Sequence, residues 1–233
     1  MNLPPLRIAA ITSLLAAAVG SVACSSTPYD ASSFTETCGT PADLVGKTPF
    51  DSVELRMRRI AIPGAVGGVD ASAPAPGEAP TFTVLDTRGT PCASASDADT
   101  CNKKAIAATT ESSDWMSSNE MRGGYYSPAT AYAVTYFVVT RGDDVRVLAS
   151  RAELADYFGP LDSPAKGVLA YSPSKKTCLA AKTDADGTAI LREERNGCGD
   201  VDRQTLIRVG PTGQVSERAE AISTGSCSAP IPS

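Results

Sequence analysis

The chain has 233 residues, 26 acidic and 21 basic side chains, and no histidine. Without histidine there can be no Ser-His-Asp or Cys-His catalysis and no histidine metal ligand, so zinc would need cysteine or carboxylate ligands alone. The net charge of −5 has no basic block, which argues against nucleic acid as a partner. The absence of histidine therefore excludes most classes of hydrolase and metalloenzyme.

The first 23 residues have the pattern of a secretory signal peptide. Arg7 is the only charged side chain before a run of small and apolar residues over 8–23, and small residues precede Cys24. The run is shorter than the ~20 residues that a comfortable membrane span needs. We therefore predict that residues 1–23 are a signal peptide and that the chain is exported.

The residues Val22-Ala23-Cys24 resemble the lipobox of bacterial lipoproteins. The resemblance implies that Cys24 is acylated, becomes the new N-terminus and anchors the chain in the lipid bilayer of the cell envelope. Ser25 after this cysteine favours the outer membrane. Ser21 stands where the lipobox usually has leucine and also suits ordinary signal peptidase, so a periplasmic or secreted protein without lipid is the alternative.

The cysteine count agrees with an anchor at Cys24. The chain has seven cysteines, and lipid on one leaves six, enough for three disulfides in an oxidising compartment. A loop of nine residues favours the pair Cys92–Cys101, and a predicted hairpin favours Cys178–Cys198. The remaining pair, Cys38–Cys227, would tie the beginning of the domain to its end.

The N-terminal part alternates between polar segments and one clear strand. Residues 24–37 are rich in serine and threonine and are predicted to be a flexible tether. Thr40-Pro41-Ala42-Asp43 predicts a short helix. Alternating apolar residues from Ser52 predict a half-buried strand, with a bulge near Arg59 because Ile60 and Ile62 change phase. The Pro/Gly/Ala-rich residues 63–80 are predicted to be a mobile loop.

The downstream part contains the strongest strand pattern. Residues 81–86 predict a strand, and a helix capped by Asp99 or Thr100 is expected to reach Ala108. Residues 131–140 have apolar side chains on both faces, which predicts a central strand that returns through residues 145–148 as a hairpin.

Two helices and a strand-rich end follow. Ser150 with Glu153 predicts a helix through Phe158, and Ser163-Pro164 begins another toward Tyr171. The rest predicts short strands and turns. The expected fold class is α+β, an antiparallel sheet with a few short helices that is cross-linked by disulfides. We expect it to form a single domain over 38–233.

Several short motifs each have a simpler structural interpretation. Arg141-Gly142-Asp143 matches an integrin-recognition tripeptide but also suits a tight turn. Ser-x-x-Lys, the nucleophile motif of penicillin-binding proteins, occurs twice without its partner motifs. Calcium ligands and an aromatic binding platform are the other candidates, against a solvated turn and packed tyrosines. The residues of these motifs are Ser163 and Lys166, Ser172 and Lys175; Asp184, Asp186, Gly187, Asp200 and Asp202; and Trp115, Tyr125, Tyr126, Tyr132 and Tyr136.

The segment Tyr157-Phe158-Gly159-Pro160-Leu161-Asp162-Ser163-Pro164 resembles a segment of uncharacterised exported proteins of myxobacteria, in which a Gly-Pro-Ile-Asp-Thr-Pro helix start precedes a strand-rich, cysteine-containing tail. Lys166-Gly167 departs from the continuation typical of that group. The resemblance implies an exported protein and brings no activity with it.

These observations predict a cell-envelope lipoprotein that acts as a binding or structural module with a protein or glycan partner. No catalytic residue, cofactor or metal is assigned. The alternative is a histidine-independent envelope hydrolase that uses Asp/Glu or Ser/Lys. Two carboxylates in one cleft with raised pKa values would favour that enzyme.

Overall fold

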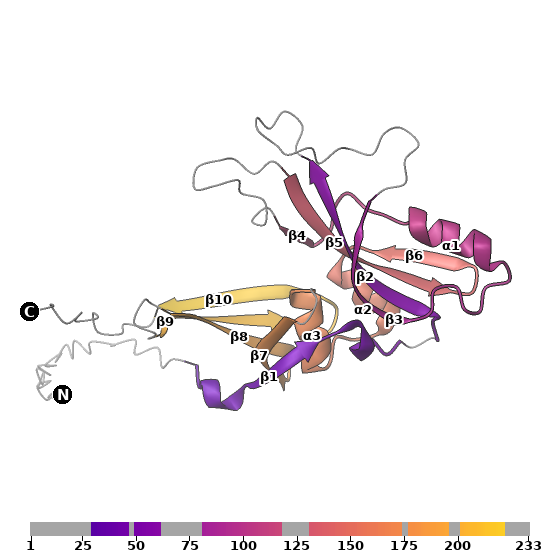
Figure 1. Cartoon of the computed structure of the whole chain (residues 1–233). Helices are drawn as coiled ribbons and strands as arrows, with labels where there is room; N and C mark the ends of the chain where they lie inside the picture. The colour runs from indigo at the N-terminus through magenta and orange to yellow at the C-terminus, as the bar shows by residue number, and fades with distance from the viewer. Residues whose placement is uncertain are drawn as a thin grey trace, which may run out of the picture.

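The computed structural model describes residues 29–46, 49–61, 81–117, 131–173, 177–195 and 201–221. They form two antiparallel five-stranded sheets and three short α-helices (Figure 1). The α+β class is confirmed, whereas the single domain stays a prediction. The predicted loop at 63–80 lies outside the described residues.

The first sheet, called the β5 sheet below, is built around the strand with the strongest sequence pattern. β5 pairs with β2 on one side, and β4 and β6 follow each other along its other side. β5 is therefore the central strand that was predicted. The strands of this sheet are β3 (Thr83–Gly89), β2 (Ser52–Ala61), β5 (Ala131–Arg141), β4 (Trp115–Ser117) and β6 (Asp144–Leu148).

The second sheet, called the β8 sheet, combines the beginning of the described chain with its end. Its strands stand in the order β1, β7, β8, β9, β10, so that β1 and β10 are the two edges. All neighbours are antiparallel. Their bounds are β1 (Thr35–Gly39), β7 (Thr177–Asp184), β8 (Gly187–Arg195), β9 (Val201–Val209) and β10 (Val215–Ala221).

Two helices with serine caps lie between the sheets (Figure 1). α2 (Arg151–Phe158) has the predicted capping box of Ser150 with Glu153, and α3 (Pro164–Tyr171) begins at proline after its N-cap Ser163. Both predicted helices are confirmed. One buried cluster includes side chains of both helices and of both sheets, among them Leu154, Leu169, Phe137 and Ile207.

β2 and β5 of this sheet each have two apolar faces. Val53 and Leu55 of β2 face the main core with Phe137, while Ile60 belongs to a second cluster with Val134, on the opposite face. The bulge predicted near Arg59 is therefore wrong, because Ile60 packs on that second cluster without a change of phase. The pairing of β2 with β5 runs without a shift, and the irregularity lies at Leu55/Arg56 against β3.

A third helix lies beside the hairpin β5–β6. α1 (Ala98–Ala107) is capped by Asp97 rather than by Asp99 or Thr100, and it contacts β6. The buried side chain of Arg56, on β2, donates to the carbonyl oxygens of Ala105 (2.7 Å) and Ala108 (3.3 Å). Arg56 thus fastens the end of α1 to the sheet.

The folded part begins before Cys38, so the predicted tether over 24–37 is too long. A 3₁₀ turn at Ala31–Ser33 is capped by Asp30, and β1 begins at Thr35. Serine and threonine side chains suit this segment because they satisfy backbone groups locally and because an edge strand needs few core side chains. The second 3₁₀ turn, Pro41–Asp43, has the capping box expected from Thr40 and Asp43.

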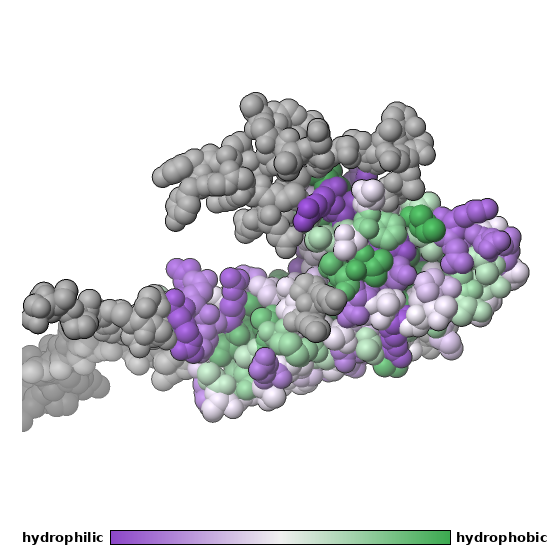
Figure 2. Space-filling view, viewed as in Figure 1, coloured by the Kyte–Doolittle hydropathy of each residue, from purple (hydrophilic) through white to green (hydrophobic). Residues whose placement is uncertain are grey.

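Surface character differs along the molecule. In Figure 2, hydrophilic side chains gather at the outer end of the β8 sheet, whereas the strongest hydrophobic colour lies on the half that carries β2, β5 and α1. Within the described ranges, no helix has the length and apolar character to cross a membrane.

Candidate functional site

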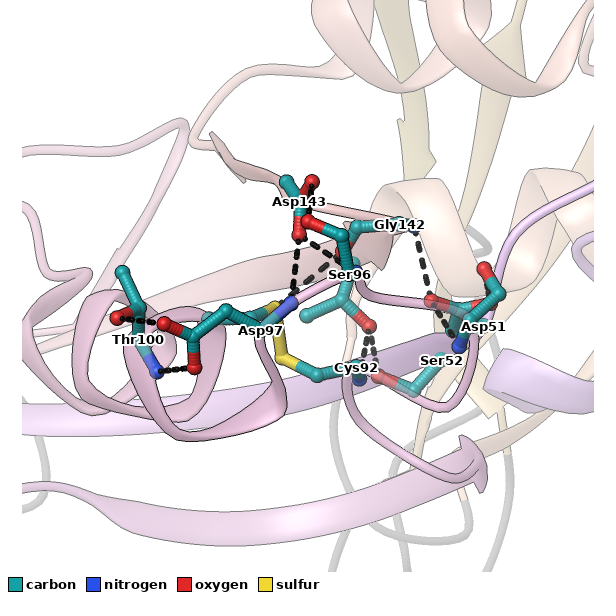
Figure 3. Close-up of a disulfide and its surroundings, with 11 residues drawn as sticks. Asp51, Ser52, Cys92, Ser96, Asp97, Thr100, Gly142 and Asp143 are labelled. Carbon is teal, nitrogen blue, oxygen red and sulfur yellow. Dashed lines mark hydrogen bonds between the residues drawn. A yellow bond between two sulfur atoms is a disulfide. The ribbon is translucent and has the colours of Figure 1, made fainter.

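One disulfide joins Cys92 to Cys101 beside the turn between β5 and β6, as predicted (Figure 3). Its two cysteines are 2% and 1% exposed. Asp51 accepts hydrogen bonds from Ser94 and from the backbone N–H of Gly142, at 2.6 to 3.2 Å. This acid therefore holds the disulfide loop, residues 91–97, against the β5–β6 turn.

A second acid, which belongs to the β5–β6 turn itself, also holds the disulfide loop. Asp143 accepts hydrogen bonds from the backbone N–H (2.9 Å) and the hydroxyl (2.6 Å) of Ser96. These bonds hold the pKa of the Asp143 carboxyl below its usual value. Arg141-Gly142-Asp143 is thus part of a structural turn, which agrees with its simpler interpretation.

The other disulfide joins Cys38 to Cys178, so the predicted pairs Cys38–Cys227 and Cys178–Cys198 are wrong. The prediction assumed that Cys178 would face the next strand along the chain. Instead β1 is the outer neighbour of β7, and Cys38 lies directly opposite Cys178 in their register. Cys24, Cys198 and Cys227 lie outside the described residues.

The Ser-x-x-Lys motif at Ser163 does not form a nucleophile with its lysine. The hydroxyl of Ser163 accepts the backbone N–H of Lys166 (3.3 Å), while the ammonium of Lys166 donates to Asp162 (3.1 Å) and to a carbonyl oxygen. The motif is therefore a helix cap followed by an ion pair. For the second motif, Lys175 lies outside the described residues.

Two of the acids that the sequence offers as calcium ligands bind an arginine side chain instead. Asp184 and Asp186 both bond the guanidinium of Arg208. Asp200 lies outside the described ranges. No group of three or more metal-ligating side chains is present in the part of the chain that the structure describes.

The tyrosines and Trp115 do not share one face. Trp115 packs on Phe137 in the main core, with ring centroids 5.4 Å apart, and its indole N–H donates to the carbonyl oxygen of Ala170. Tyr132 and Tyr136 belong to the second cluster, on the opposite face of β5. The aromatic platform that includes Trp115 is thus wrong, because neighbouring positions of β5 alternate between faces. Tyr125 and Tyr126 are not among the described residues.

A hollow of about 460 Å³ lies where the link from β1 to β2 passes the edge strand β3. We call it the Arg88 hollow. Val45 is 64% exposed there, and the half-buried ring of Phe50 supplies further apolar surface. Its lining residues are Val45, Gly46, Pro49, Phe50, Asp51, Arg88 and Gly89.

The guanidinium of Arg88 is fixed in this hollow by neutral groups. One terminal nitrogen donates to the carbonyl oxygens of Ala42 (3.0 Å) and Leu44 (2.8 Å), and the guanidinium carbon lies 5.2 Å from the ring centroid of Phe50. No carboxylate of the described residues lies within 4.0 Å of it. Asp51 lines the same hollow, but its carboxylate binds the disulfide loop.

Arg88 is thus a cation in a fixed position whose remaining N–H groups can donate to an anion. A guanidinium matches the two oxygens of a carboxylate, and its attraction is stronger beside an apolar wall than in open water. Sequence reasoning missed this residue because a single arginine in a strand has no motif. Its importance comes from the carbonyl groups of residues 42 and 44, which only the fold brings near.

Comparisons with known proteins do not assign this chain to a family. No family model, no curated protein and no solved structure matches this chain.

Among the described residues, the carboxyl groups whose pKa values are shifted all have lowered pKa values, whereas an acid catalyst needs a raised one. Hydrogen bonds from Ser32 and Thr100 lower the pKa values of Asp30 and Asp97, and the bond from Lys166 lowers that of Asp162. Burial raises the pKa of Asp51, but its hydrogen bonds outweigh burial and the net shift is downward. A general acid needs the opposite shift.

Proposed function

We propose that the protein is a lipid-anchored binding module of the bacterial cell envelope, and that the Arg88 hollow binds a ligand whose carboxylate adjoins an apolar group. The observation that carries the binding function is the guanidinium of Arg88, held by two backbone carbonyls without a carboxylate partner among the described residues. A short peptide ending in an apolar residue has this chemistry.

Location is supported by independent features. The described part contains two disulfides, which indicate an oxidising, extracytoplasmic compartment. The lipobox-like residues before Cys24 support acylation there, and Ser25 after it supports an outer-membrane position. Mass spectrometry of the membrane-extracted protein tests this: the N-terminus should be a lipid-modified Cys24. An unmodified Cys24 would refute the anchor.

The histidine-independent hydrolase stays the alternative function. It would need a carboxyl group with a raised pKa or a serine activated by lysine. The lowered pKa of Asp162 and the separate partners of Ser163 and Lys166 favour the binding function over it.

Binding is tested with two small ligands that differ in one group. The mature chain with Cys24→Ser is titrated with N-acetyl-leucine and with N-acetyl-leucine amide, and backbone NMR shifts are followed. We expect shifts around Phe50 and Gly89 with the free acid, and none with the amide, because only the acid carries the charge that Arg88 attracts.

Two variants locate the binding. Val45→Glu places a carboxylate at the mouth of the hollow, and since Val45 is 64% exposed the fold should persist while binding is lost. Arg59→Gln removes an exposed arginine of β2 and is the matched control, which should bind normally. Equal binding of acid and amide, or binding that survives Val45→Glu, would refute the site.

A further inference from the structure

The segment before β1 crosses the outer face of the β8 sheet, the face that does not carry α3. At one end, the hydroxyl of Tyr29 donates to Glu220 of β10 (3.4 Å). At the other, Lys182 of β7 donates to the hydroxyl of Ser33 (2.9 Å) and lies 4.3 Å from the ring centroid of Phe34. β8 and β9 lie between these two strands, so residues 29–34 pass over them.

Beside the start of this segment is a second hollow of about 400 Å³, which we call the Arg208 hollow. It contains two guanidinium groups, and their side chains are 41% and 76% exposed for Arg208 and Arg218. Its lining residues are Tyr29, Leu206, Arg208, Ser216, Glu217 and Arg218.

The position of the anchor restricts which surface can meet the membrane. Cys24 is five residues before Tyr29, and an extended chain spans at most ~3.5 Å per residue. The acylated cysteine therefore holds Tyr29 within about 17 Å of the headgroups. A tether over 24–37 would have allowed more than twice this distance.

We propose that the outer face of the β8 sheet, at the Arg208 hollow, rests on the phospholipid headgroups of the membrane that holds Cys24. This inference depends on the acylation of Cys24 proposed above. Tyr29, which lines the hollow, is the described residue nearest the anchor, so the hollow is the recessed surface that the short connection brings to the bilayer.

The chemistry of the Arg208 hollow fits a zwitterionic headgroup. Arginine pairs with phosphate through parallel N–H···O bonds. Tyrosine is enriched at membrane interfaces because its ring is apolar and its hydroxyl polar. The acids that face these arginines, Asp184, Asp186 and Glu220, balance their charge, so the surface suits zwitterionic rather than strongly anionic lipid.

Fluorescence quenching tests the orientation. The lipidated protein is reconstituted into phosphatidylcholine vesicles with a lipid that carries a nitroxide on its headgroup. Ser216→Trp reports on the Arg208 hollow, and Ile106→Trp, at an exposed position of α1, is the control on the other half of the molecule. We expect the added tryptophan to be quenched in Ser216→Trp and unquenched in Ile106→Trp.

A pair of arginine variants tests the headgroup contact. Arg218 and Arg146 each form a surface ion pair with an acid two residues away, with N···O distances of 3.0 and 2.8 Å. In the Ser216→Trp protein, Arg218→Gln should reduce the quenching, and Arg146→Gln should leave it unchanged. The inference is overturned by equal quenching at positions 216 and 106, or by quenching that Arg218→Gln does not alter.

Flotation of the vesicles separates the two proposals. Protein that floats with the vesicles but shows no preference for position 216 retains its anchor and loses the proposed orientation. Protein that does not float refutes the anchor, and the orientation with it.

Discussion

Cys38 and Cys178 lie directly opposite each other on β1 and β7, and the disulfide between them joins the first strand of the fold to a strand 140 residues later. Cys38 is exposed and Cys178 half-buried. The bond between Cys92 and Cys101 is instead buried under the disulfide loop, with 2% and 1% of the two residues exposed. The two disulfides therefore differ both in the loop that they close and in their access to solvent.

This difference predicts the order of reduction. A mild reductant at neutral pH should open Cys38–Cys178 before Cys92–Cys101, because a thiolate must reach a sulfur atom to exchange with it. Iodoacetamide trapping followed by peptide mapping would show the order. Labelling of the cysteines of both disulfides at the same time would contradict this order.

The same difference predicts the stability of serine variants. By the chain-entropy model, closing a loop of 140 residues stabilises by about 5 kcal/mol and closing one of nine by about 3 kcal/mol. Cys38→Ser should therefore lower the melting temperature more than Cys92→Ser. A larger effect of Cys92→Ser would show that local packing around the buried disulfide outweighs loop entropy.

The corrected pairing leaves Cys198 and Cys227 as the remaining pair of the six cysteines after Cys24. Cys198 precedes β9 and Cys227 follows β10, and these strands are antiparallel neighbours with Ala221 opposite Arg203. We expect a third disulfide between these two cysteines. Peptide mapping of unreduced protein would test it, and a free thiol at either position would contradict it.

Local sequence patterns predicted most of the elements but not how they come together. Ser150, Ser163 and the two-faced pattern of β5 act within a few residues, and each of these predictions is confirmed. The place of β1 beside β7 depends on packing between distant segments. Sequential order therefore led to the wrong partner for Cys178.

The candidate site was less predictable than the fold. Arg88 has no local pattern because its hydrogen-bond partners, the carbonyl groups of Ala42 and Leu44, come from a turn more than forty residues earlier. Ser163 and Lys166 did match a motif, but helix capping explains that spacing fully. In this chain, short motifs indicated local structure, whereas the binding hollow required the tertiary contacts.

The hydrogen bonds to Asp143 predict a dependence of stability on pH. Because Ser96 lowers the pKa of Asp143 in the folded state, the stabilisation is present above the unfolded pKa of about 3.9 and is lost as the pH falls through the folded value. Urea unfolding at pH 7 and at pH 3 should show a smaller difference for Asp143→Asn than for the natural chain. Asp144→Asn, the next residue of the turn, is the control, since Asp144 pairs with Arg146 instead.

The buried guanidinium of Arg56 predicts a large loss of stability on its removal. Arg56 is 3% exposed, pairs with Glu54 and bonds the last carbonyls of α1. Arg56→Met would leave Glu54 and these carbonyls without their donor, at a cost of about 3–5 kcal/mol. Arg59→Met, an exposed arginine of the same strand, should change the free energy of unfolding by no more than about 0.5 kcal/mol. Similar effects of both substitutions in urea unfolding would contradict this role.

The contact between α3 and β8 depends on Gly167. A Cβ atom at this position would overlap the Cβ, Oγ1 and Cγ2 atoms of Thr188, which is 1% exposed. Gly167→Ala in a free helix would gain up to about 1 kcal/mol from helix propensity. In this protein the overlap should make Gly167→Ala destabilising instead, and lower the free energy of unfolding by about 1–3 kcal/mol.

A double-mutant cycle isolates this contact. Thr188→Ala alone removes the hydroxyl that donates to the carbonyl oxygen of Ser163 (3.0 Å) and should be destabilising. In the Gly167→Ala background it also removes two of the three overlapping atoms, so there it should cost less or become stabilising. Urea midpoints of the four proteins measure the coupling. Additive effects, or a Gly167→Ala protein more stable than the natural chain, would show that α3 can move away from β8 without loss.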